Sequence, residues 1–396
     1  MRTVNLSEFL VFFLTTWLLV LSLHLFLYLS LLKWLNITAF KPRLILAIIF
    51  FILSLTFVGA ILLMNWQDNI ITRVFYFGTG LWLALAVNLI LASILIWLIL
   101  ALTKIFHLTI DFKILAIVFF ISAGFYTVYG LWNAFNPTVK NIEVPIKNLP
   151  AAWREKKIIQ LSDVHLGLIN GQKYSEKLVA QVNAQKPDVI LITGDLFDAM
   201  PDNLNQFVAP LNQLEAPLGI FFVTGNHENY RGLDQILPIL AKTKIQVLAD
   251  RVINLEGLQI IGVSYPVYSQ TRDIKKTITT DPNYQNGRPT VLLFHTPTDI
   301  GSNQKSVLEQ QYSTYWSPQI RFSLARELGV NLQLSGHTHD GQIFPFNFIT
   351  KFIYDGYNYG LNYNEDLAIY TSCGVGTWGP PVRTGSRSEI VSIKLK

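Results

Sequence analysis

The sequence predicts an N-terminal region of four transmembrane helices followed by an α/β domain. Hydrophobic residues make up 51% of the 396 residues and charged residues only 14%, whereas an ordinary soluble protein has roughly 25% charged residues. The apolar excess lies in the first third of the chain. From about Val139 onward, short β-rich runs alternate with helical stretches, which is typical of an α/β domain. We therefore expect a transmembrane region over residues 1–138 and a second domain over residues 139–396.

Four segments are long and apolar enough to cross a bilayer, which takes about 20 largely apolar residues. They span residues 9–32, 44–64, 77–102 and 114–135. Charged residues lie between the segments, and tryptophan and tyrosine gather near their ends, as at membrane interfaces. A cleaved signal peptide would account for one such segment but not for four. We interpret the four segments as the anchor of an integral membrane protein.

His24 is the only ionisable residue well inside a predicted span. Such a group is a candidate for function. However, no span offers it an acidic partner, and we find no inverted repeat of the transporter kind. We therefore favour a packing role for His24 and an anchoring role for the spans.

The basic residues flanking the spans predict an orientation. The side that holds the first and third connections carries Lys33, Lys41, Arg43, Lys104 and Lys113. The opposite side carries Arg2 and Arg73, and the residues after the last span add Lys140, Lys147 and Arg154. When only the short loops are counted, the positive-inside rule places the first set of basic residues in the cytoplasm. Both termini and the C-terminal domain would then be extracytoplasmic.

The charge balance of the C-terminal domain excludes one class of partner. Seven of the 31 Lys and Arg residues and three of the 26 Asp and Glu residues precede residue 139, which leaves 24 basic and 23 acidic residues for the rest. A nucleic-acid partner would require a basic face, so we expect none. Cys373 is the single cysteine and can form no internal disulfide. We find no signal for the oligomeric state.

The elements of the C-terminal domain follow from its β-rich runs and helix boundaries. Strands are expected over Lys157–Leu161, Val189–Thr193, 219–224, 259–263, Thr290–Phe294 and 332–334, and helices over 174–185 and 204–214. A further helix is bounded by Ser317 as N-cap, Pro318 at its first position and Gly329 just past its end. Residues 302–315 are polar without a clear period and predict a surface loop.

Five short polar motifs each follow a predicted strand. They are Ser162-Asp163-Val164-His165, Gly194-Asp195, Gly225-Asn226-His227-Glu228, His295 alone and Gly336-His337-Thr338-His339. Functional groups of α/β sheets collect in loops beyond the carboxyl ends of strands. Carboxylate oxygens and imidazole nitrogens bind divalent transition metals, and a preceding glycine allows the tight turn that such a loop needs. The motifs therefore predict a metal site.

The distribution of histidines strengthens this prediction. One histidine after a strand is more often an ordinary polar residue than a metal ligand. Here all five histidines of the C-terminal domain lie in the five motifs. Asp163, Asp195 and Asn226 occupy matching positions. Coincidence is a poor explanation for this many potential ligands at strand ends.

The ordered set of motifs resembles the calcineurin-like metallophosphoesterase superfamily, and the match runs from about Lys157 to the end of the chain. A closer resemblance is to bacterial membrane-associated members, the YkuE/YaeI-like group. Residues 334–342 match a segment of that group, with Asp340 replacing a glycine. The segments Gly374-Val375-Gly376-Thr377 and Pro381-Val382-Arg383 match its late Gly-x-Gly-Thr and Pro-x-Arg segments.

The resemblance implies a four-layer α/β/β/α sandwich of two mixed sheets with two divalent metal ions, Mn, Fe or Zn. One metal would be held by Asp163, His165, Asp195 and His339, and the other by Asp195, Asn226, His295 and His337. Hydrolysis of a phosphoester or pyrophosphate bond would use a hydroxide held between the metals, with Asp195 and His227 as catalytic residues and His227 as proton donor to the leaving group. Position 198 is Asp rather than the tyrosine ligand of purple acid phosphatases, so that branch is not expected.

Three features leave alternatives open. Asp340 adds a carboxylate that either orients His337 or His339 or faces water. Residues 302–316 resemble an insertion that either shapes the substrate pocket or decorates its rim. Arg383 either binds a substrate phosphate or forms a surface salt bridge.

The membrane anchor favours a membrane lipid or lipid-linked phosphoester as substrate. Because some members of the group resemble UDP-diacylglucosamine hydrolases, a pyrophosphate-linked glycolipid is a specific candidate. The alternatives are a soluble phosphodiester or phosphomonoester, a non-catalytic membrane receptor that retains the fold, and a transporter with a regulatory phosphatase domain.

Overall fold

The computed structural model describes residues 6–200, 202–266, 272–301 and 318–396, with side chains from residue 14 onward. The chain begins with four apolar helices, α1 (Leu6–Trp34), α2 (Phe40–Trp66), α3 (Ile70–Ile105) and α4 (Phe112–Ala134). By length and composition, each can cross a membrane. The prediction of four apolar N-terminal helices is therefore confirmed. The longest, α3, begins seven residues before its predicted segment, where Asn69 caps the helix, and ends three residues after it.

Polar side chains within the helical region bind one another. His24 is buried, its Nδ1 lies 2.8 Å from the carbonyl oxygen of Val20, and its Nε2 accepts a hydrogen bond of 3.1 Å from Trp82 Nε1. Asn88 donates to Thr127 at 2.9 Å. In an apolar environment each unpaired polar group would be costly, so these pairs stabilise helix packing. The contacts of His24 agree with the packing role predicted for it.

Two six-stranded mixed sheets form the α/β domain. In the first, the strand order is β1 (Thr138–Val144), β12 (Glu389–Leu395), β2 (Lys157–Leu161), β3 (Val189–Thr193), β4 (Ile220–Val223) and β5 (Ile245–Val247). In the second, the order is β10 (Gly360–Asn364), β11 (Leu367–Thr371), β9 (Leu332–Ser335), β8 (Thr290–Phe294), β7 (Leu258–Val263) and β6 (Arg251–Leu255). Strands β2 to β5 run parallel to one another, as do β7, β8, β9 and β11. The loops that follow the parallel strands of one sheet therefore collect at one edge.

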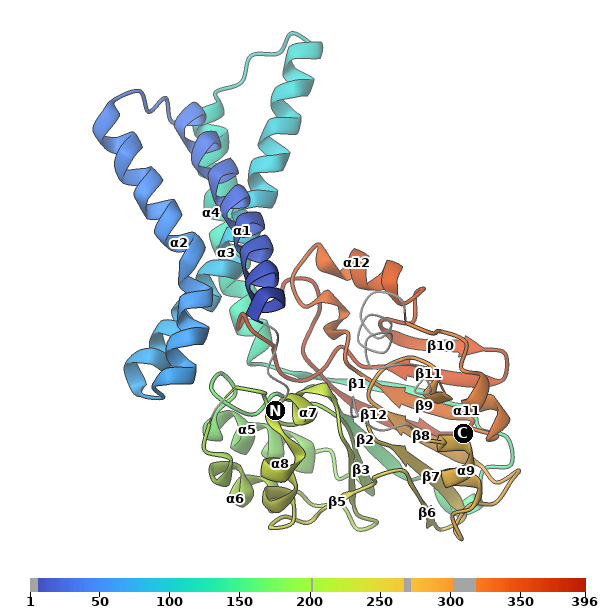
Figure 1. The fold of residues 1–396 in the computed structure, drawn as a ribbon. Helices are drawn as coiled ribbons and strands as arrows, with labels where there is room; N and C mark the ends of the chain where they lie inside the picture. The colour runs from blue at the N-terminus through green and yellow to red at the C-terminus, as the bar shows by residue number, and fades with distance from the viewer. Residues whose placement is uncertain (1–5, 201, 267–271, 302–317) are drawn as a thin grey trace. The chain divides into compact units, whose positions relative to one another are not determined.

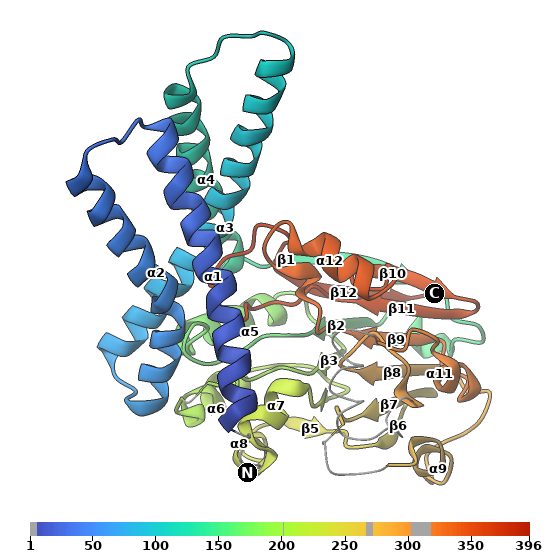
Figure 2. The ribbon, with the colours of Figure 1, turned by 45° about the horizontal axis from the view of Figure 1, so that its top comes forward.

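The two sheets pack face to face and are covered by helices on both outer sides. Apolar residues of both sheets form the core between them, for example Leu191 from β3 and Leu293 from β8. Helices α5 (Gln172–Asn183), α6 (Val208–Leu211) and α8 (Leu233–Leu240) lie outside the first sheet, and α9 (Ile274–Thr279) and α11 (Ser323–Glu327) outside the second (Figures 1 and 2). This order of layers is the four-layer sandwich that was predicted.

Alternate residues of the buried strands point in opposite directions. One set faces the inner core between the two sheets, and the other faces the outer core between a sheet and its helices. In β3, Leu191 faces the inner core, whereas Ile190 and Ile192 belong to the core beneath α5. Both faces of these strands are covered, so their sequences are mainly apolar and do not alternate with polar residues. That pattern explains why the predicted bounds of β2, β3 and β8 agree with the structure.

Two predicted helices require correction. The helix expected from Pro318 begins only at Ser323, because the Asp299 side chain accepts hydrogen bonds from the backbone and hydroxyl of Ser323 and caps the helix there. Ser317 and residues 302–316 lie outside the described residues. The helix expected over 204–214 is a 3₁₀ turn (Leu204–Phe207) followed by the short α6, which contains Pro210.

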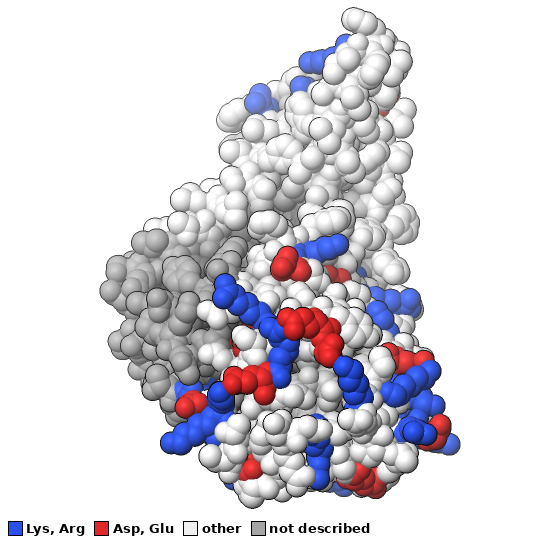
Figure 3. All heavy atoms as spheres, turned by 90° about the vertical axis from the view of Figure 1, so that its right-hand side faces the viewer, with Lys and Arg blue, Asp and Glu red and all other residues white. Residues whose placement is uncertain are grey.

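Contacts divide the chain into two compact units. One comprises Met1–Leu131 with Gly379–Val382, and the other Trp132–Trp378 with Arg383–Lys396. Their surfaces differ in charge. In the view of Figure 3, acidic and basic side chains intermingle on the α/β unit, whereas the helical unit is almost uncharged away from its loops. The intermingling fits the near-neutral balance found in the sequence.

Candidate metal centre

The five polar motifs meet at one edge of the sandwich. Asp163 and His165 follow β2, Asp195 follows β3, Asn226 follows β4, His295 follows β8, and His337 and His339 follow β9. Backbone hydrogen bonds join neighbouring loops. The Asp163 N–H donates to the Gly194 carbonyl at 3.1 Å, and the Gly336 N–H donates to the His295 carbonyl at 2.8 Å. The loops are thus held at spacings set by the sheets beneath them.

One group of side chains surrounds the Asp163 carboxylate. Nε2 of His165 lies 3.0 Å from Nε2 of His339, and the latter lies 3.4 Å from Asp163 Oδ1. Potential ligand atoms of these three residues all lie within 4.8 Å of one another. Asp195 Oδ2 lies 3.9 Å from His165 Nε2 and so borders this group.

A second group adjoins the first through the same Asp195 oxygen. Asp195 Oδ2 lies 3.1 Å from His295 Nε2. Asn226 Oδ1 lies 3.0 Å from His295 Nε2 and 2.9 Å from His337 Nδ1. The structure therefore brings together all seven residues predicted as metal ligands, in two groups that share Asp195.

The chemistry of the two groups fits divalent metals. The seven side chains are buried or nearly so, and they present carboxylate, amide and imidazole atoms to a common space. His165 Nε2 and His339 Nε2 lie 3.0 Å apart, and two imidazole nitrogens at this distance are stabilised by a proton or a cation between them. Buried polar atoms need such a partner. Mn, Fe and Zn all accept this donor set.

Glycines allow the loops to approach one another closely. A Cβ atom on Gly225 would lie 2.1 Å from Asp195 Oδ1, and one on Gly336 would lie 2.2 Å from Asp163 Oδ2. Gly194 has φ +91°, and a Cβ there would overlap the ring of His295. Each glycine thus leaves room for a proposed ligand from another loop.

Five of the seven proposed ligands have left-handed backbone conformations. Asp163, His165, Asp195, His337 and His339 have φ between 48° and 73°. Such conformations are uncommon for non-glycine residues and cost about 1–3 kcal/mol each. Cross-loop hydrogen bonds hold them in place, so part of the folding free energy maintains the arrangement of the site.

Burial and neighbouring charges shift the pKa values of the imidazoles in the site. Burial, reinforced by neighbouring cationic imidazoles, lowers the pKa of His165 and of His337 to about 3, so both rings are neutral and offer lone pairs at pH 7. For His295, burial lowers the pKa, but the charge of Asp195 outweighs it and raises the pKa to about 9. Metal binding at His295 Nε2 therefore displaces a proton.

His227 has different partners. Its Nδ1 lies 3.3 Å from Asp198 Oδ1, and its ring stands edge-on to the rings of His165 and Trp378. Burial lowers the pKa of His227, but the carboxylates of Asp195 and Asp198 outweigh it and raise the pKa to about 9. At pH 7 this imidazole carries a proton.

Two carboxylates with no role in the sequence interpretation position other site residues. Asp198 holds Nδ1 of His227. Glu228 is fully buried and accepts hydrogen bonds from the backbone N–H groups of Asp195, Phe197 and Gly225, at 3.0, 3.1 and 2.7 Å. Glu228 thereby joins the second and third motif loops. Its position within the Gly225-Asn226-His227-Glu228 motif is the sequence feature that could have identified it.

The side chain of Arg383, a candidate for binding a substrate phosphate, contacts other parts of the protein. Its side chain is fully buried and donates to the carbonyls of Gly376 and Cys373, to Ser386 Oγ and toward His339 Nδ1 at 3.1 Å. It is neither a surface salt bridge nor turned toward solvent. These contacts place its charge behind His339.

Asp340 is partly buried and has a partner that neither alternative included. Its Oδ1 accepts a hydrogen bond of 2.6 Å from Asn358, whose carbonyl in turn accepts from Thr338 Oγ1 at 2.6 Å. Burial raises the pKa of Asp340 to about 6. The Asp340 carboxylate therefore fastens the ligand loop after β9 to the loop before β10.

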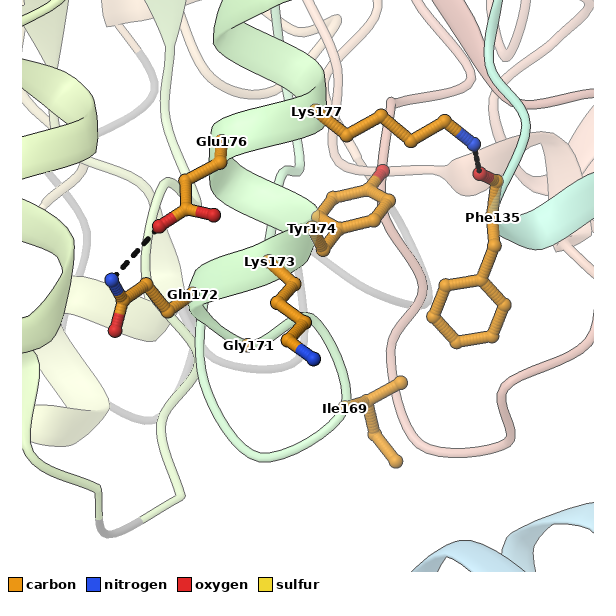
Figure 4. A pocket seen from close by; sticks show the side chains of 8 residues that line it. All are labelled: Phe135, Ile169, Gly171, Gln172, Lys173, Tyr174, Glu176 and Lys177. Carbon is orange, nitrogen blue, oxygen red and sulfur yellow. Dashed lines mark hydrogen bonds between the residues drawn. The ribbon is translucent and has the colours of Figure 1, made fainter.

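A surface pocket with a volume of about 700 Å³ lies apart from these groups, around the beginning of α5 (Figure 4). Lys177 crosses its edge and donates to the Phe135 carbonyl at 2.8 Å, and Lys173 projects beside it. None of the proposed ligands lines this pocket.

Comparison with known proteins agrees with this geometry. Residues 156–341 match the calcineurin-like phosphoesterase family. The chain is 32% identical over 291 residues to a metallophosphoesterase of Campylobacter jejuni, covering 72% of this chain and 71% of that protein. It is 33% identical over 289 residues to a transmembrane protein with metallophosphoesterase domain of Bos taurus, covering 68% and 60%. It is 27% identical over 278 residues to the metallophosphoesterase YkuE of Bacillus subtilis, covering 68% and 90%. The chain belongs to the calcineurin-like metallophosphoesterase family.

Proposed function

We propose that this protein is a membrane-anchored, metal-dependent hydrolase of phosphoester or pyrophosphate bonds. The observation that carries the proposal is the shared position of Asp195 Oδ2, which lies 3.1 Å from His295 Nε2 and 3.9 Å from His165 Nε2. One carboxylate can thereby serve both groups of ligands. Bound there, two divalent ions would supply positive charge to the phosphoryl oxygens and an acidified water.

The residues around the proposed metal site divide the remaining tasks. His227, protonated and held at Nδ1 by Asp198, has its other ring nitrogen available to donate a proton to the departing oxygen. Glu228 binds the backbone of Asp195 and of Gly225 and so holds the loops of Asp195 and Asn226 together. Arg383 supports His339 from behind. These are the contacts that a preorganised hydrolytic site requires.

We further propose that the substrate is linked to lipid, and a glycolipid with a pyrophosphate bond such as UDP-diacylglucosamine is the specific candidate. The four apolar helices support this, because they keep the domain beside a bilayer. Detergent-purified protein supplied with Mn should be assayed against phospholipids, nucleotide-linked lipids and soluble aryl phosphodiesters. Activity restricted to the soluble esters would reject the lipid-linked substrate.

The metal requirement has its own test. Elemental analysis should find close to two ions of Mn, Fe or Zn per chain. Asp195→Asn should lose metal and activity together, because an amide lacks the charge needed to serve both metals. Asp366→Asn is the matched control, since the Asp366 carboxylate is exposed and pairs with Lys147. Wild-type protein that binds no metal after reconstitution would end the proposal.

A further inference from the structure

Helix α12 (Phe346–Ile353) turns its apolar side outward. Its sequence places the phenylalanines and isoleucines on one arc and Asn347, Thr350 and Lys351 on the other. A surface helix normally buries its apolar side against the core. Here no residue of α12 is buried, and Phe348 and Phe352 are 61% and 87% exposed.

The exposed apolar area continues beyond the helix. We define the α12 surface by Phe344, Phe346, Phe348, Ile349, Phe352 and Trp378, all of which are exposed. Phe344 packs edge-on against Phe348 with a centroid distance of 5.8 Å. Trp378 is 59% exposed. Aromatic side chains in such a cluster are costly to leave in water and mark an interaction site.

Direct contacts connect the α12 surface to the proposed site. Gln342, three residues after His339, accepts a hydrogen bond of 2.9 Å from the Trp378 backbone N–H and donates one of 3.0 Å to its carbonyl. The Trp378 ring lies 6.2 Å from the His227 ring. The surface therefore borders the side of the site from which His227 would meet a leaving group.

The chain itself indicates what covers this surface. It carries four helices able to cross a bilayer, so a membrane is always within reach of the domain. Exposed aromatic and aliphatic side chains with a single lysine have the composition of a helix that lies in a membrane interface.

We propose that the α12 surface docks into the interface of the bilayer that holds the spans, and that this docking lets the site receive phosphoesters carried by lipids. Docking is independent of the proposed hydrolase activity, whereas lipid delivery rests on it. The partner is thus a phospholipid surface, bound through side chains outside the metal site.

The first test measures docking without using activity. In the full chain, Phe352→Cys is labelled with an environment-sensitive fluorophore and reconstituted into vesicles of phosphatidylcholine and phosphatidylglycerol. Leu237→Cys, at an exposed position of α8, is the matched control. The wild-type chain gives the labelling background, because Cys373 is buried.

Label at position 352 should shift its emission to the blue, be quenched by lipid-borne doxyl groups and resist aqueous iodide. Label at position 237 should show the reverse. Equal behaviour at the two positions would overturn the proposal. Resistance to iodide without quenching by doxyl lipids would also overturn it, since protein, such as a second copy of the chain, would then cover α12.

The second test measures lipid delivery. The variant with both Phe348→Ser and Phe352→Ser should raise the KM for a lipid phosphoester in vesicles by about tenfold or more, because each buried phenylalanine contributes at least that much to affinity. Its turnover of a soluble aryl phosphodiester should not change, and Leu237→Ser should change neither value. Equal losses on both substrates, or none, would reject delivery. A wild-type chain inactive on every substrate would reject the hydrolase proposal, while the fluorescence result would still decide docking.

Discussion

His227 and the proposed ligand Asn226 are adjacent in one loop but have separate surroundings. Asn226 Oδ1 contacts His295 and His337, whereas the His227 ring lies between Asp198 and the rings of His165 and Trp378. His165, Asp195 and His227 nevertheless form a third group with metal-ligand spacing. A substitution can separate the two roles open to His227, proton donor and ligand.

We expect His227→Ala to retain both metals and to lose about 10²- to 10⁴-fold in activity on alkyl phosphoesters, the usual contribution of a general acid. Its activity on nitrophenyl esters should fall much less, because their leaving group needs little protonation. His339→Ala should lose metal and fail on both classes. Metal analysis and paired kinetic assays provide the measurement. Loss of metal from His227→Ala would identify His227 as a ligand. Equal losses of activity on both substrate classes with the metals retained would identify it as a substrate-positioning group.

Glu228 offers a second prediction at the residue scale. Glu228→Gln replaces one acceptor oxygen by an amide donor that faces backbone N–H groups of Asp195 and Gly225 or of Phe197. The free energy of unfolding should fall by about 1–3 kcal/mol, the cost of leaving a buried donor unpaired, and metal affinity should fall with it. Thermal melting with and without metal checks this. The exposed Glu215→Gln is the control, and equal melting of the two variants would contradict the positioning role.

At the scale of elements, the loops after the strands work as a set because they approach within van der Waals distance. Gly225 begins the turn into α7 (Asn226–Arg231), directly against Asp195. A side chain at this position must displace either the Asp195 loop or the Asn226 loop. Both carry proposed ligands.

Gly225→Ala should therefore deplete metal and activity, since its Cβ would lie 2.1 Å from Asp195 Oδ1 and 2.6 Å from Asp195 N. Gly171→Ala is the matched control, because the nearest atom to a Cβ there is a carbonyl oxygen at 3.9 Å. Elemental analysis and melting of both variants make the comparison. Full metal content in Gly225→Ala would show that the loops can separate without losing the site.

At the scale of the whole molecule, the orientation in the membrane remains a prediction. Arg73, near the start of α3, pairs at 2.6 Å with Asp68 of the second connection, so the two charges neutralise one another there. The first and third connections keep their basic residues at the ends of α1 to α4. This contrast favours those two connections as cytoplasmic and the α/β domain as extracytoplasmic.

A fusion of alkaline phosphatase to the C-terminus should then be active, because that enzyme matures only outside the cytoplasm. A fluorescent-protein fusion at the same position should be dark. The opposite pair of results would place the α/β domain in the cytoplasm. Substituting Lys41 and Arg43 together should weaken the bias and give mixed orientation in the same assay.

Local patterns in the sequence were sufficient for part of this structure. The four apolar helices and strands β2, β3 and β8 are segments rich in hydrophobic residues. Their burial depends on composition more than on distant partners. The five polar motifs could be located because each follows such a run. Edge strands were harder, since β1 pairs with β12 some 250 positions away, and a half-exposed edge has no continuous apolar signal.

The sequence by itself determined the apolar helices, the buried parallel strands and the identity of the residues that meet at their ends, because short-range hydrophobicity and residue chemistry specify these features. Only the tertiary structure decided how those residues are held. Four features depend on atoms brought together by the packing of two sheets. They are the left-handed backbone of five proposed ligands, the contacts of Glu228 and Asp198, the burial of Arg383, and the start of α11 at Ser323, which Asp299 caps. The physical reason is that these features form cooperatively. Each costly local conformation is stabilised by hydrogen bonds from a different part of the chain.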